Sequence, residues 1–100
     1  MDKPVFAPIC LTLYDENDET VRDLQKSVVC WGMMKQALAV GKIIQQHGED
    51  SPETVDAITA FVCRFYDDKV TIAELDRGAE LREVMAVYHA VMRRAGALGN

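Results

Sequence analysis

The chain has 100 residues, of which 49% are hydrophobic, and its formal net charge is −5 at pH 7. This length and apolar content predict a single domain, residues 1–100, with a real hydrophobic core. The acidic balance argues against a nucleic-acid coat, because binding to a polyanion depends on Lys and Arg neutralising phosphates, so a protein partner is expected.

The sequence has no stretch that approaches the about 20 apolar residues of a membrane span. The short apolar stretch at the N-terminus is interrupted by Pro8 and lacks the longer hydrophobic region of a secretory signal. We therefore expect a cytoplasmic protein without a membrane partner. The cysteines are odd in number and widely separated, which favours buried, reduced thiols over a disulfide framework: Cys10, Cys30 and Cys63.

Alternating apolar residues near the N-terminus predict a half-buried strand: Ile9, Leu11 and Leu13. Residues 15–19 are turn formers, and residues 20–29 can return as a second strand with Leu24 and Val28 facing inward. Because an isolated two-stranded hairpin is marginally stable in water, this antiparallel hairpin must pack on helices or pair with another copy. The three apolar residues of the first strand are therefore candidates for self-association at the hairpin edge, with packing in the core as the alternative.

From Cys30 onward the apolar period becomes that of a helix. One stripe contains Trp31, Met34, Leu38 and Gly41, and the stripe beside it contains Met33, Ala37, Val40 and Ile44. This surface is wide enough to contact two neighbours, so Trp31 and Met34 are candidate partner-binding residues, with burial in the core as the alternative. Gly48 is expected to end this helix.

Three further helices are predicted downstream. Ser51 as the cap and Pro52 at the first helical position begin the second, whose inner stripe is Val55, Ile58, Val62 and Phe65. Thr71 and Glu74 form a capping box that begins a short third helix, and Gly78 suits a left-handed residue that ends it. The fourth has apolar residues at Leu81, Val84, Met85, Tyr88, Val91 and Met92. The predicted fold class is α+β, mainly α, with an N-terminal β-hairpin followed by about four helices.

The sequence offers no active site, so we expect no enzymatic activity, no metal and no cofactor. His47 and His89 are far apart and lack the spacing of a metal-ligand pair. Cys63 and His89 could meet as nucleophile and base, but no oxyanion-hole pattern accompanies them. Residues 15–19 are acidic but lack the fixed Gly and Glu positions of an EF-hand loop. The domain is therefore expected to act by binding.

Three segments carry a family resemblance. They are LTLYDENDET at residues 11–20, VVCWGMMKQAL at residues 28–38 and VTIAELDRGAELREVM at residues 70–85. Their order resembles the opening hairpin, first helix and C-terminal half of the tail assembly chaperones of long-tailed (siphovirus-type) bacteriophages and prophages. The resemblance extends over residues 9–95.

This resemblance implies a non-enzymatic chaperone that binds and solubilises the helical tape-measure protein and helps recruit subunits of the major tail (tube) protein. It also implies self-association, action in the cytoplasm of the bacterial host and absence from the mature virion. Many members of the family have a longer form made by a backward ribosomal frameshift. The C-terminal Leu98-Gly99-Asn100 is compatible with a slippery codon run, which we treat as a hypothesis.

Two alternatives come from other classes of protein. Residues 71–91 have the outline of a helix-turn-helix and would suggest a small DNA-binding regulator, but Glu80 and Glu83 at the start of the second helix oppose the approach of phosphates. A generic helical adaptor is the other alternative. A phosphopantetheine attachment site at Ser51 is disfavoured, because Pro52 follows it and Ser51 suits a helix cap.

Overall fold

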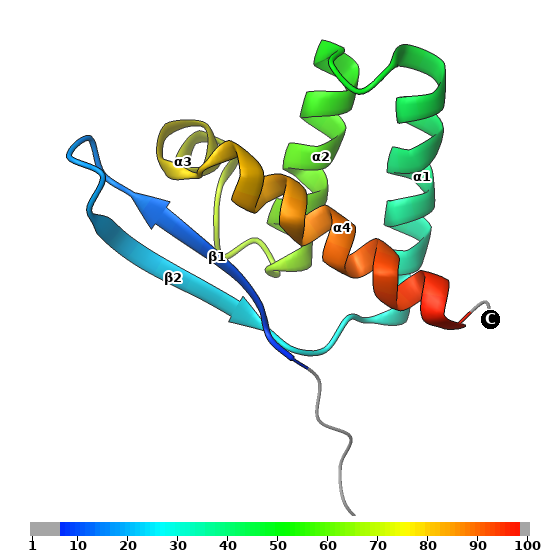
Figure 1. The fold of residues 1–100 in the computed structure, drawn as a ribbon, viewed down its shortest axis with the longest axis horizontal. Coiled ribbons are helices and arrows are strands. Elements are labelled where there is room, and N and C mark those ends of the chain that lie inside the picture. The colour runs from blue at the N-terminus through cyan, green and yellow to red at the C-terminus, as the bar shows by residue number, and fades with distance from the viewer. Residues whose placement is uncertain (1–6, 99–100) are drawn as a thin grey trace, which may run out of the picture.

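The chain folds into a hairpin followed by four helices (Figure 1). The computed structural model describes the backbone of residues 7–98 and the side chains of residues 7–94. The elements, in chain order, are β1 (Ile9–Tyr14), β2 (Thr20–Lys26), α1 (Trp31–His47), α2 (Pro52–Phe65), α3 (Ile72–Gly78) and α4 (Leu81–Leu98). The two strands form one antiparallel sheet, so the predicted mainly helical α+β fold is confirmed.

The helices surround a core that the hairpin closes on one side. Figure 1 shows α1 and α2 as neighbouring antiparallel helices, with α4 crossing them and the hairpin beside α3 and α4. The largest fully buried side chains, which come from β1, α2, α4 and the α2–α3 loop, are Phe65, Leu11, Val62, Val70, Val87, Val91 and Thr54. Burial of such side chains supplies the main favourable term in the folding of a domain of this size.

The hairpin buries one of its faces. Leu11 lies opposite Leu24 in the register, and both are buried. At the turn, the Asp15 carboxylate accepts backbone N–H groups of Asn17 and Glu19 at 2.8 and 3.0 Å. Asp18 takes a φ of 62°, a conformation that Asp tolerates better than most residues. These contacts satisfy backbone N–H groups of the turn, and residues 20–26 return along β1.

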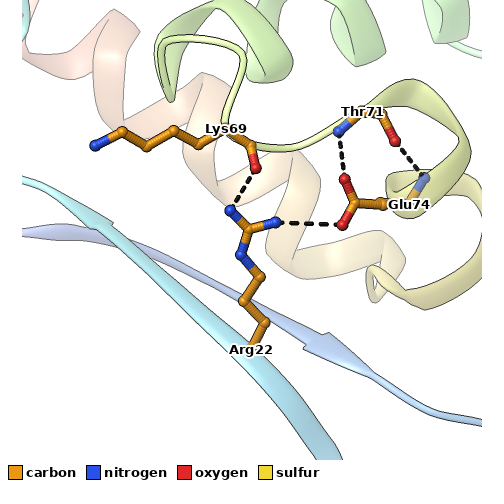
Figure 2. A network of polar contacts seen from close by, with 4 residues as sticks. All are labelled: Arg22, Lys69, Thr71 and Glu74. Carbon is orange, nitrogen blue, oxygen red and sulfur yellow. Dashed lines mark hydrogen bonds and ion pairs between the residues drawn. The ribbon is translucent and has the colours of Figure 1, made fainter.

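Arg22 of β2 joins the hairpin to the segment that precedes α3 (Figure 2). Its guanidinium lies 3.2 Å from the Glu74 carboxylate and also donates to the backbone carbonyl of Lys69. Glu74 and Thr71 form the predicted capping box, with the two reciprocal hydrogen bonds at 3.0 and 3.1 Å. The backbone N–H of Thr71 is the main cause that lowers the pKa of Glu74. One carboxylate thus caps α3 and holds the hairpin.

The turn between α1 and α2 satisfies its polar groups within a few residues. Gly48 ends α1 with a φ of 87°, and its N–H donates to Ile44 at 2.8 Å, as expected for a glycine cap. The Ser51 hydroxyl caps α2 by accepting the N–H of Thr54 at 3.1 Å. Thr54 also donates to the Gly48 carbonyl at 2.6 Å and is buried, whereas Val55 is exposed. The prediction that Val55 faces the core is therefore wrong: the first turn of α2 points its threonine inward.

Gly78 does not have the left-handed conformation predicted for it. Among the described glycines only Gly48 has a positive φ, and Ala79, the residue that follows α3, is the C-cap in an extended conformation. A Cβ atom on Gly78 would lie 2.7 Å from the backbone oxygen of Tyr14. At this point α3 approaches β1 so closely that Leu13 and Ala79 form an isolated bridge. The glycine is required by this close approach rather than by its own φ.

Two other residues predicted to face the core are exposed, namely Val28 and Leu81. β2 ends at Lys26, so Val28 lies in the connection to α1 and does not follow the alternation of the strand. Leu81 is the first residue of α4 and precedes the part of the helix that packs on the core, where Val87 is buried. Both errors come from extending a regular pattern beyond the end of the packed element.

Candidate interaction surface

The surface of α1 opposite the core carries large exposed apolar side chains. Trp31 is 71% exposed and Leu38 is 53% exposed, and their seven-residue spacing places them on one side of the helix. The core side of α1 consists of Met33, Ala37 and Val40. Of the two helical stripes in the sequence, one is therefore buried and the other faces solvent.

Positive charge accompanies these apolar residues. Lys35 and Lys42 are exposed and lie, by helical period, on the same side as Leu38. α1 contains no Asp or Glu, although the whole chain has a net charge of −5. We call the solvent side of this helix the α1 face: Trp31, Met34, Lys35, Leu38 and Lys42. It is an apolar and basic surface on an acidic protein.

A pocket of about 370 Å³ adjoins the beginning of α1. Its charged lining residues are Lys26, Lys35, Arg64 and Asp67. Lys26 donates to the Asp67 carboxylate at 2.9 Å and lies 5.5 Å from the centre of the Phe65 ring. Within residues 7–94, Lys35 and Arg64 form no ion pair, so the pocket has an excess of positive charge.

The backbone at the start of α1 is open to this pocket. The N-cap residue Cys30 makes no side-chain cap hydrogen bond, and the first turn contains no acidic residue. A Cβ atom placed on Gly32 would have no neighbour within 4 Å. The positive end of the helix dipole therefore has no compensating side chain within the first turn of α1 itself, and it lies in the same pocket as Lys35 and Asp67.

The structure separates the five residues predicted to bind partners into two groups. Trp31 is exposed and Met34 is half-buried, so both belong to the α1 face. Ile9, Leu11 and Leu13 are buried beneath the helices, which is the core alternative stated for them. Their side chains pack within this chain because β1 lies against α3 and α4. Self-association through the hairpin edge remains a prediction, and it would involve the backbone rather than these side chains.

Three functional candidates were missed in the sequence, namely Leu38, Lys35 and Lys42. Leu38 belongs to the same stripe as Trp31, but the sequence predicts partner binding only for Trp31 and Met34 on this helix. The two lysines are ordinary surface residues when taken singly. Residues 31–47 contain no acidic residue although the chain as a whole is acidic. This is the signal that would have identified the helix as a basic candidate binding surface.

The cysteines and histidines do not form a catalytic arrangement among the described residues. Cys63 is buried, and burial raises the pKa of its thiol, whereas His89 is exposed. No hydrogen bond joins the two. Cys10 and Cys30 are exposed, so the prediction of three buried thiols is wrong for these two. Cys10 lies on the outer face of β1, and Cys30 precedes α1 at its cap.

The described part of the chain contains no group of three or more residues arranged to hold a metal ion. None of the helices within residues 7–98 combines the length and apolar character needed to cross a membrane. Comparison of the chain with protein-family models, with curated proteins and with solved structures finds no match.

Proposed function

We propose that the protein is a non-enzymatic tail assembly chaperone of a long-tailed bacteriophage or prophage. In this role it binds the tape-measure protein, keeps it soluble and helps recruit tail-tube subunits, in the cytoplasm of the bacterial host and without remaining in the mature virion. The proposal comes from the order of the three sequence segments described above. A binding function of this kind is supported by the exposed α1 face.

The α1 face is the structural observation that supports a binding function. A chaperone of a long helical protein needs apolar surface that remains exposed after the chaperone itself has folded. The side chains of Trp31 and Leu38 meet this need, since both are large, apolar and more than half exposed. Helix-in-groove and helix-on-helix recognition use such residues at spacings of three, four and seven.

Release of the partner requires no chemistry under this proposal. One exposed helix face offers a small contact area, so each copy is expected to bind weakly. Several copies bound along one rod, with contacts between neighbours, would give a stable coat through their combined effect. As the tail tube grows, its added subunits could then displace the chaperone copies one at a time.

The start of α4 argues against the DNA-binding alternative. The Glu80 carboxylate accepts the backbone N–H groups of Arg82 and Glu83 at 2.8 and 3.1 Å, so an acid caps this helix. The Glu83 carboxylate accepts the hydroxyl of Tyr14 at 2.7 Å. A recognition helix would place this end against the phosphates of DNA, where two carboxylates oppose binding.

Gene context tests the proposal. The coding DNA should be sequenced across the codons of Leu98, Gly99 and Asn100 and into the following gene; Gly99 and Asn100 lie outside the residues that the structure describes. The proposal predicts a very long following gene rich in helical heptads, and a slippery run with an overlapping backward frame would add further support. A neighbourhood without a long helical protein would count against a tail chaperone and favour a generic adaptor.

A further inference from the structure

The proposed function names a partner but not the chemistry by which the α1 face selects it. We propose that this face receives an acidic amphipathic helix, whose apolar residues cover Trp31 and Leu38 and whose carboxylates pair with Lys35 and Lys42. The inference rests on the proposed function, because it describes how the same partner is recognised.

Charge complementarity identifies the occupant. The α1 face combines two exposed lysines with no carboxylate, and α1 as a whole contains neither Asp nor Glu. A partner helix with acids beside its apolar stripe would pair with both lysines, whereas a basic helix would be repelled. The lysine stems also add apolar contact around Leu38, since Lys buries its methylene chain and keeps its ammonium group in water.

The pocket at the beginning of α1 extends this complementarity. Lys35 belongs both to the α1 face and to the pocket lining, so the two surfaces are continuous. A carboxylate in the pocket would lie among Lys35, Arg64 and the open backbone at Gly32. The Asp67 carboxylate in the same lining is paired with Lys26, so the other two cations remain for the partner. One end of the acidic partner helix therefore lies beside Trp31, at the beginning of α1. The positive end of the α1 dipole adds to the attraction there.

A second copy of this chain fits the α1 face less well. In a symmetric pair the same surface meets itself, so the lysines of one copy would oppose those of the other. Like charges in such a contact oppose association. The acidic turn at residues 15–19 is a hairpin turn rather than a helix and does not present an apolar stripe.

Trp31 provides the readout, because it is the single tryptophan of the chain. The full chain is titrated with a synthetic amphipathic helical peptide that has leucines at positions i, i+3 and i+7 flanked by Glu. The same peptide with Lys in place of Glu is the comparison. We expect the Glu peptide to shift Trp31 emission to shorter wavelength and to bind at least about tenfold more tightly than the Lys peptide. This preference should weaken with added salt, which screens exposed charges.

A charge-reversed protein tests the assignment of the two lysines. The double variant Lys35→Glu and Lys42→Glu should reverse the preference and bind the Lys peptide more tightly. The matched control is Lys69→Glu, which makes one reversal at an exposed lysine whose side chain extends away from Arg22 (Figure 2) and should leave the preference unchanged. Circular dichroism of each variant checks that the helices remain.

The outcomes separate this inference from the proposed function. Equal binding of the two peptides, or a double variant that keeps the original preference, would overturn the acidic-helix assignment. The assignment would also be overturned if Trp31 emission shifted on anionic phosphatidylglycerol vesicles but not on the Glu peptide, because the face would then bind a membrane surface. A shift of Trp31 emission caused by raising the protein concentration alone would overturn it as well, because the face would then bind a second copy of the chain. If the long helical protein still depends on Trp31 in a pull-down after such a result, the proposed function stands and only the chemistry of its partner changes.

Discussion

Replacement of Gly78 by alanine tests how closely α3 approaches the hairpin. A Cβ atom at this position would lie 2.7 Å from the backbone oxygen of Tyr14 and 3.4 Å from its backbone nitrogen. A backbone oxygen cannot move aside as the end of a flexible side chain can, so β1 or α3 must shift. Overpacking of this kind costs about 1–3 kcal/mol, whereas the gain in helix propensity is at most about 1 kcal/mol. We expect a net loss of about 1–2 kcal/mol in the free energy of unfolding.

Gly41→Ala is the matched control, because it makes the same chemical change within α1. Its Cβ atom would meet only the Tyr88 hydroxyl, at 3.9 Å, which is an ordinary contact. Stabilisation of about 0.4–1 kcal/mol is expected there. Urea unfolding followed by circular dichroism measures both variants, and each kcal/mol should move the thermal midpoint by about 4–8 °C. If Gly78→Ala were as stable as Gly41→Ala, the close approach of α3 to β1 would be refuted.

Three further predictions follow from buried or charged groups. Tyr66→Phe removes the buried hydroxyl that donates to the Ile9 carbonyl at 2.8 Å, so urea unfolding should show a loss of about 1–3 kcal/mol. The pKa of Glu74 is lowered, chiefly by the backbone N–H of Thr71, so its contribution to stability is present above its unfolded pKa. That contribution is lost as pH falls through the folded pKa, and a Glu74→Gln variant should lose less stability on acidification than the parent. In a thiol-labelling assay the two exposed cysteines should react rapidly and Cys63 slowly, because its thiol is buried and has a raised pKa; equal rates at all three would contradict this burial.

Local signals in the sequence were sufficient to predict the order of the elements. The alternation of β1, the Ser51 cap and the Thr71–Glu74 capping box are each determined by residues close together in the chain. Their physical causes are local, since a cap needs only a side chain and a nearby backbone N–H. The fold class followed from these boundaries without knowledge of the packing.

The role of Gly78 could not be predicted, because it depends on Tyr14, a residue far away in the sequence. The burial of the two apolar stripes of α1 was difficult to predict for the same reason. Periodicity showed that both stripes exist, but only the packing of α2 and α4 against one of them leaves Trp31 and Leu38 on the surface. Which side of an apolar helix is buried is a tertiary property, and this is why the candidate site was only partly predicted.

The most direct test of partner binding by the α1 face is co-expression with the long helical protein that the proposed function predicts beside this chain, followed by measurement of how much of that protein remains soluble and co-purifies. Trp31→Glu is expected to abolish solubilisation of that protein while the circular dichroism of the variant is unchanged. Leu81→Glu is the control, because Leu81 is 75% exposed and is the first residue of α4. Figure 1 shows that α4 begins beside α3 and away from α1. The Leu81→Glu variant should still solubilise the long helical protein. Equal effects of the two substitutions, or full solubilisation by the Trp31 variant, would contradict the assignment of the α1 face as the partner-binding surface.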